Sequence, residues 1–156
     1  MENKKWGKKL RENKSLLVQT GDNQLLQMKS FSYEVAGHQP EGIYLLYEIF
    51  QLRSIALPFE EVALDLIEWT EKPVVFSTFP SNLLEDATNS DALIKFALIK
   101  EPYWRDFLFN SGQIVLCQSR KNGIPECTSN RPFPWTTPSA INMFIGPDGE
   151  VKIWNE

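Results

Sequence analysis

The segment that decides the predicted fold is residues 57–79, LPFEEVALDLIEWTEKPVVFSTF. Its apolar residues fall on one side of a wheel with 3.6 residues per turn, which is the pattern of an amphipathic helix. These residues are Phe59, Val62, Ala63, Leu66, Ile67 and Trp69, and Leu64 lies outside the stripe. Pro73 ends the helical pattern, because proline lacks a backbone donor. The β-branched and aromatic residues that follow, 74–79, predict a buried strand.

The opposite side of this predicted helix carries Glu61, Asp65 and Glu68, spaced i, i+4 and i+7. Three carboxylates on one face favour a docking surface for a basic protein, because charge complementarity speeds association. Two other interpretations stay open, a plain solvated face and a divalent-cation site. A cation site is disfavoured because carboxylates from one helix do not converge on an ion.

A chain of 156 residues predicts one domain. We expect a basic N-terminal arm or short helix over 1–14 and a single α+β domain over 15–156. Its helices are expected to pack on one face of a mostly antiparallel sheet, with the C-terminal half forming a β-meander. Asp91 to Lys100 is predicted to be a helix. A second helix is predicted to begin at Pro102 and to end at Gly112, the residue types that favour helix starts and stops.

Turn residues between apolar runs predict three hairpins. Their strand pairs are 15–20 with 23–35, 113–118 with 124–127, and 141–145 with 150–154. The second hairpin would bring Cys117 close to Cys127, and we expect both thiols to be reduced. Residues 43–52 are apolar nearly all round, so periodicity does not separate buried helix from buried strand; Pro40 and Glu41 favour a helix.

The first fourteen residues hold six of the sixteen basic residues and only two acids. This segment carries +4 and the rest of the chain −8. A basic arm can bind nucleic acid or an anionic surface, and we expect nucleic acid to bind only here, if at all. The alternatives are a solvated turn or an arm folded onto its own acidic face. Only Trp6 and Leu10 offer burial, so deleting residues 1–12 is expected to lower the melting temperature little.

The proline-rich segment 130–138 contains Arg131, Phe133 and Trp135, residue types that are enriched in interface hot spots. We predict that these three side chains also bind the partner. The alternative is a loop whose aromatic rings cover the sheet edge.

The composition offers little material for cofactor chemistry, with two cysteines, one histidine and eight scattered glycines. No cofactor or metal is predicted. His38 could serve as a general base, but no nucleophile is evident beside it. No apolar run approaches the ~20 residues of a membrane span, and no secretory signal precedes the first strand. We therefore expect a cytoplasmic protein without membrane contact.

The segment from Pro102 to Leu108 is similar to a helix motif of the SUKH immunity-protein superfamily, but that motif lies early in its own chain, so no property is transferred. We predict a non-enzymatic binding protein, such as an inhibitor, an immunity protein or a small regulatory adaptor. The alternative is a small-molecule-binding domain or small enzyme. Its pocket would contain His38 or a carboxylate. The aromatic residues that would line the pocket are Tyr44, Tyr47, Trp104 and Trp135.

Overall fold

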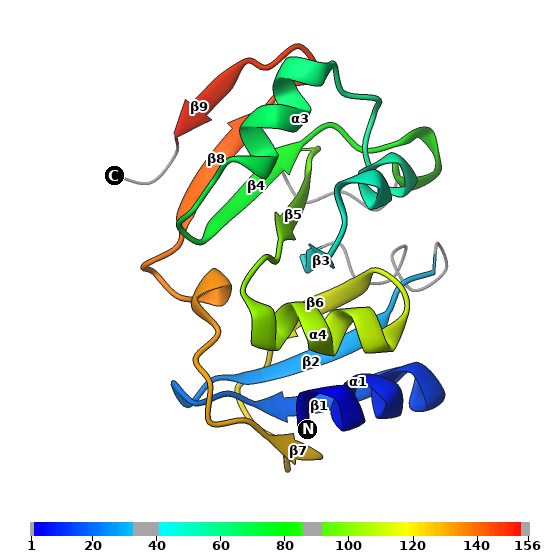
Figure 1. The fold of residues 1–156 in the computed structure, drawn as a ribbon, viewed down its shortest axis with the longest axis vertical. Helices are drawn as coiled ribbons and strands as arrows, with labels where there is room; N and C mark the ends of the chain where they lie inside the picture. The colour runs from blue at the N-terminus through cyan, green and yellow to red at the C-terminus, as the bar shows by residue number, and fades with distance from the viewer. Residues whose placement is uncertain (1, 33–40, 86–91, 154–156) are drawn as a thin grey trace.

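The computed structural model describes residues 2–32, 41–85 and 92–153. The helices are α1 (Glu2–Asn13), α3 (Glu61–Glu68) and α4 (Pro102–Ser111), with 3-10 turns η1 (Ile49–Ser54), η2 (Asn82–Leu84) and η3 (Pro134–Thr136). The strands are β1 (Ser15–Gln19), β2 (Leu25–Ser30), β3 (Ile43–Leu46), β4 (Val74–Thr78), β5 (Ile94–Leu98), β6 (Val115–Ser119), β7 (Cys127–Thr128), β8 (Ile141–Ile145) and β9 (Val151–Ile153). Together they form one compact α+β unit (Figure 1).

In the described residues, the nine strands belong to one mixed sheet, in the order β7-β1-β2-β6-β3-β5-β4-β8-β9. The pairs β1–β7, β3–β5 and β4–β8 are parallel. The predicted mostly antiparallel sheet and C-terminal β-meander are therefore wrong. After β6 the chain does not turn back on itself but continues to the edge of β1, where β7 pairs with it in parallel. There the Leu17 N–H donates to the Glu126 carboxylate at 3.0 Å.

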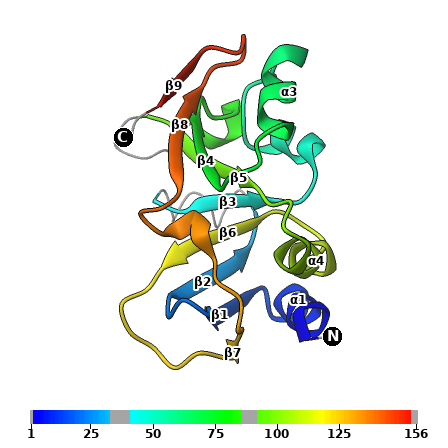
Figure 2. The same ribbon diagram turned by 60° about the vertical axis from the view of Figure 1, so that its left-hand side comes forward.

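The core lies on both faces of the central strands. Successive side chains of a strand point to opposite faces, and in β6 Val115 and Cys117 join one apolar cluster whereas Leu116 joins another. Helices α1 and α4 contribute to the first cluster, and α3 contributes Ala63 and Ile67 to the second. Figure 2 shows α1 and α4 side by side. The buried contacts of the helices therefore do not match the expected single layer of helices on one face of the sheet.

Two segments predicted to be helices contain strands, although residues 49–52 of the first lie in the 3-10 turn η1. Residues 43–46 form β3 and residues 94–98 form β5, and the two pair in parallel at the centre of the sheet. Strands of this kind are covered on both faces and are apolar nearly throughout. Their sequences therefore lack the alternation that would have separated them from a buried helix.

Several local predictions are confirmed. Helix α3 is followed directly by the fully buried strand β4. Helix α4 begins at Pro102 and ends at Gly112, which has the left-handed φ of 79°. The hairpins β1–β2 and β8–β9 form as expected, although the first has a loop over 20–24 instead of a two-residue turn.

The N-terminal segment is an ordered helix packed on α4. Gly7 makes this close approach possible, because a Cβ there would lie 2.3 Å from the Phe107 carbonyl oxygen. Leu10 is completely buried, and Asn3 donates to the Tyr103 carbonyl at 2.9 Å. Trp6 and Leu10, the two residues expected to offer burial, do pack against the core. Because the contacts at Gly7 and Asn3 add to them, we now expect deletion of the segment to be more costly than the sequence suggests.

The two cysteines are buried and unbridged. Cys117 pairs with Met28 on β2, whereas Cys127 pairs with Val18 on β1. Three strand steps separate β6 from β7, about 14 Å at the usual spacing. The predicted proximity is wrong, because the second hairpin does not form.

Candidate functional site

A cleft of about 500 Å³ opens where α4, the α3–β4 connection and the proline-rich segment meet. We call it the Trp104–Trp135 cleft. Its lining residues are Glu71, Lys72, Pro73, Leu98, Lys100, Glu101, Trp104, Arg131, Pro132, Pro134 and Trp135. Clefts of this size accommodate small-molecule ligands.

The cleft lies at the carboxyl end of β5. Strand β5 ends at Leu98, and the chain passes through Lys100 and Glu101 into the first turn of α4. The orange η3 turn, which contains Pro134 and Trp135, lies between α4 and β8 (Figure 1). Three segments that are distant in sequence therefore form the walls.

The proline-rich wall is held by aromatic packing. The Trp104 indole N–H donates to the Pro132 carbonyl at 2.8 Å. Phe133 is completely buried and lies edge-on to Trp104, with ring centroids 5.2 Å apart, and 4.9 Å from Trp135. Phe133 and Trp135 thus anchor the wall in the core, whereas Pro132 stays exposed.

A second anchor comes from the β1–β2 loop. The Phe133 N–H donates to Asp22 Oδ1 at 3.2 Å, and Gln24 Nε2 donates to the Phe133 carbonyl at 2.7 Å. Burial raises the pKa of the Asp22 carboxyl, but hydrogen bonds from Thr20, Gln24 and the Phe133 N–H outweigh it. The pKa therefore lies below its ordinary value of 3.8. Because this anchor joins residues 111 positions apart, no local pattern predicts it.

The cleft contains three cations and two carboxylates. Lys100 is engaged in the fold, since its ammonium donates to the Glu68 carbonyl at 2.7 Å and to the Thr70 carbonyl. The Glu101 carboxylate accepts the Tyr103 N–H at 2.5 Å and caps α4. The other two cations of the cleft, Arg131 and Lys72, have different surroundings from Lys100. Arg131 lies over the Tyr103 ring at 5.3 Å, and Lys72 is exposed without a hydrogen bond or ion pair to any described residue.

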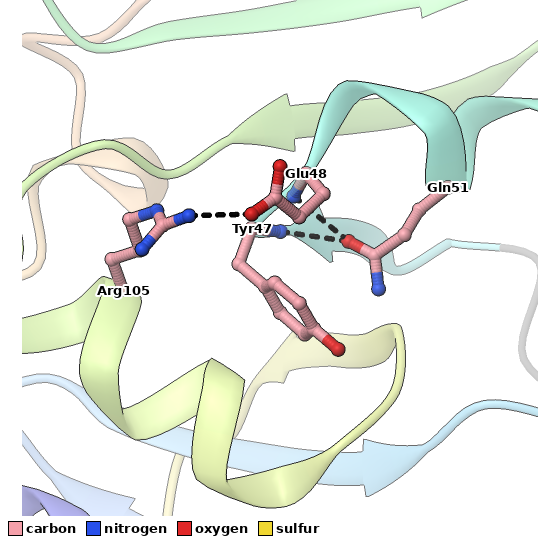
Figure 3. Close-up of polar contacts among 4 residues, drawn as sticks. All are labelled: Tyr47, Glu48, Gln51 and Arg105. Carbon is pink, nitrogen blue, oxygen red and sulfur yellow. Dashed lines mark hydrogen bonds and ion pairs between the residues drawn. The ribbon is translucent and has the colours of Figure 1, made fainter.

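Beside this cleft, a polar network joins α4 to the end of β3 (Figure 3). Arg105 Nη2 lies 2.6 Å from Glu48 Oε1. The side-chain Oε1 of Gln51 accepts the backbone N–H groups of Tyr47 and Glu48 at 2.9 and 3.1 Å. This network positions the first turn of η1 against α4.

The structure separates the six residues predicted to bind a partner. Arg131 and Trp135 line the cleft, whereas Phe133 is inaccessible in the core. The other three, Glu61, Asp65 and Glu68, lie on α3 outside the cleft.

The exposed surface of α3 is not the acidic face that the sequence predicts. Val62, Leu66 and Trp69 are 53%, 38% and 73% exposed, whereas Ala63 and Ile67 are buried. On the surface of α3, the acidic side chains are therefore interspersed with large exposed apolar side chains. Leu64, expected outside the apolar stripe, packs against the core.

Of the four aromatic residues predicted to line a pocket, Trp104 and Trp135 do so, and Tyr44 and Tyr47 do not line this cleft. His38 lies outside the described residues. Within 2–32, 41–85 and 92–153, no cluster of three or more acidic, cysteine or histidine side chains could hold a metal ion. In the same ranges, no helix has the length and apolar character needed to cross a bilayer.

Comparison of this chain with solved structures shows which known proteins have the same fold. Sua5 of P. abyssi, solved as the H234A/Y235A variant, matches with a TM-score of 0.64 and 12% identity over 92% of this chain. E. coli YciO matches with a TM-score of 0.63 and 9% identity over 98% of this chain and 89% of its own. The fold is that of Sua5 and YciO.

The chain spans about half the length of Sua5, 52% in the variant and 50% in a Sua5 structure complexed with L-threonine. MTH1692 of Methanobacterium thermoautotrophicum has the same fold, with a TM-score of 0.58 and 10% identity over 95% of this chain and 83% of its own. No protein-family model matches the sequence, and no curated protein matches it significantly.

The Sua5/YciO fold overturns the predicted function. An inhibitor, immunity protein or adaptor that presents an acidic face to a basic protein partner is contradicted by this relationship. The mixed surface of α3 gives the physical reason, because apolar side chains interrupt its carboxylates.

Proposed function

We propose that this protein is a nucleotide-binding domain with the fold of Sua5 and YciO, and that the Trp104–Trp135 cleft is its binding site. The observation that carries the proposal is the combination, in one cleft of about 500 Å³, of an apolar wall with exposed cations. A nucleotide presents the matching chemistry, an apolar planar base beside an anionic phosphate. A cytoplasmic location remains part of this proposal.

The two parts of the ligand have separate contacts. Pro132, Pro134 and Trp135 form an apolar wall against which a base can pack. Lys72 and Arg131 supply charged donors for phosphate oxygens, and such charge-assisted hydrogen bonds are stronger than neutral ones. Lys100 is less available, because its donors already serve the end of α3.

An α-amino acid is the second candidate ligand, because Sua5 of the same fold was solved in complex with L-threonine. The carboxylate of an amino acid would use the same cations, Lys72 and Arg131. It would leave much of the cleft unfilled.

Isothermal titration calorimetry with ATP, AMP and L-threonine tests the proposal. The double variant Lys72→Gln/Arg131→Gln is expected to weaken nucleotide binding by about tenfold or more, since hydrogen bonds to charged groups contribute roughly 1.5–3 kcal/mol each. Lys152→Gln is the matched control, because Lys152 is exposed on β9 outside the cleft.

Equal affinity in the double variant and the wild type would place the nucleotide elsewhere. Binding of L-threonine alone would favour the second candidate. If none of the three ligands binds the folded wild type, the proposed function is wrong.

A further inference from the structure

Helix α1 displays a row of cations that the fold does not neutralise. Its basic residues, with Lys14 directly after it, are Lys4, Lys5, Lys8, Lys9, Arg11 and Lys14, all exposed except the half-buried Lys9. The ion pairs in the described part of the chain are Arg105–Glu48 and Lys152–Glu150, and neither involves α1. The segment thus does not fold onto the acidic surface of its own domain.

This charge row works against the helix that carries it. Lys4 with Lys8, and Lys5 with Lys9, are like-charged pairs at i, i+4, which destabilise a helix. Tertiary packing at Gly7 and Leu10 holds α1 in place nevertheless. The cations are therefore displayed on a rigid support rather than on a disordered tail.

Trp6 orders two of these cations further. The ammonium groups of Lys5 and Lys9 lie 5.2 and 5.3 Å from the centre of the Trp6 ring. A cation held against an aromatic face loses less side-chain entropy when it binds an anion. The arrangement is suited to a ligand that carries several negative charges in a row.

We propose that the exposed face of α1 binds the phosphodiester backbone of a single-stranded polynucleotide. Neutralising several phosphates at once releases condensed counterions, which drives such binding. An anionic membrane fits less well. A helix that lies on a bilayer needs an exposed apolar face, and Leu10 is completely buried.

The row leads toward the Trp104–Trp135 cleft. Asn3 donates to the Tyr103 carbonyl, and Arg131, which lines the cleft, lies over the Tyr103 ring. A strand laid along α1 can therefore place its unpaired terminal nucleotide in the cleft. The preference for single strands rests on the proposed nucleotide site, whereas the backbone contact does not.

Fluorescence anisotropy with labelled twelve-residue oligo-U and oligo-dT tests the proposal over a range of salt concentrations. For single strands the logarithm of the binding constant falls with that of salt by about 0.7 per neutralised phosphate. Lys5→Gln/Lys9→Gln should reduce this slope by about 1.4 and weaken binding at low salt by tenfold or more. Lys152→Gln should change neither, and circular dichroism would check that each variant folds.

The outcomes separate this inference from the proposed function. Oligonucleotide binding that is absent at low salt, or unaffected by Lys5→Gln/Lys9→Gln, overturns the inference. Tighter binding to phosphatidylserine vesicles than to oligonucleotides, or equal affinity for a duplex, also overturns it. The same variant should leave the AMP affinity of the cleft unchanged. Oligonucleotide binding without AMP binding would reject the nucleotide cleft and with it the preference for single strands, but not the backbone contact on α1.

Discussion

Glu48 and Arg105, which are 57 positions apart in the sequence, form the ion pair that connects the end of β3 with α4, at 2.6 Å. Both side chains are 39% exposed, and exposed pairs of this kind stabilise proteins by about 1 kcal/mol or less. Gln51, 8% exposed, accepts two backbone N–H groups in the same network.

Gln51→Ala is expected to destabilise the protein more than Arg105→Ala. Loss of the carboxamide leaves the Tyr47 and Glu48 N–H groups without their acceptor, which costs roughly 1–3 kcal/mol for each group that stays buried. Loss of Arg105 removes only a partly screened pair. Urea unfolding of the two variants gives the comparison, and equal losses would show that the ion pair matters more than its exposure implies.

Gly7→Ala is expected to lower the melting temperature clearly, because the added Cβ would overlap the Phe107 carbonyl at 2.3 Å. Overpacking of this kind typically costs about 1–3 kcal/mol. Lys8→Ala, at an exposed position of the same helix, is the control and should be nearly neutral. Deletion of residues 1–12 should destabilise more than either, since it removes the buried Leu10. A deletion variant that melts with the wild type would show that α1 is dispensable.

Ile67→Ala should cost about 2–5 kcal/mol, the usual range for a buried aliphatic side chain. Leu66→Ala should cost far less, because Leu66 is 38% exposed whereas Ile67 is 0% exposed. Replacing Glu61, Asp65 and Glu68 with glutamine should leave the fold intact. Chemical denaturation measures all three variants, and the reverse order for Leu66 and Ile67 would mean that α3 presents another face to the core.

Neither thiol should react with a thiol reagent in the native protein. Burial raises the pKa of Cys117 to about 12 and that of Cys127 to about 12, and the thiolate is the reactive form. Counting thiols with Ellman's reagent at pH 8 should give none in buffer and two in guanidinium. Rapid labelling of the native protein would indicate local opening near β6 or β7.

Asp22→Asn should reduce stability at neutral pH by a small amount that disappears in acid. The pKa of Asp22 is lowered in the fold, so its carboxylate stabilises the native state above the ordinary value of 3.8. That contribution is lost as pH falls through the lower folded pKa. Melting curves of both proteins from pH 7 to pH 2 should therefore converge at the acid end. A gap that stays constant with pH would assign the effect to shape rather than charge.

The sequence predicts elements whose signals are local. Helix α4 carries its own start at Pro102 and its own stop at Gly112, and the α3–β4 junction is marked by Pro73. The strands β3 and β5 carry no such signal, because their identity depends on a parallel pairing between segments about fifty residues apart. The wrong prediction of a helix from Asp91 to Lys100 has this cause, because the segment contains β5.

The candidate site was predictable only in part. Arg131 and Trp135 stand out in a proline-rich segment, and both line the cleft. Lys72 and Leu98 come from other segments and have no distinguishing neighbours. The exposure of Val62 could not be foreseen either, because the orientation of α3 depends on the strands beneath it.

The parallel pairing of β1 with β7 constrains the order in which the chain can fold during synthesis. Val18 of β1 pairs with Cys127 of β7. More than a hundred further residues must therefore be synthesised after β1 before the strand that covers its outer edge is present. The inner neighbour of β2 is β6, which is also made late. Both edges of the β1–β2 hairpin thus stay open while the ribosome is translating the middle of the chain, and open strand edges promote aggregation. The lysine-rich helix that precedes the hairpin is made before the hairpin, and we expect its positive charge to oppose association between chains during that interval.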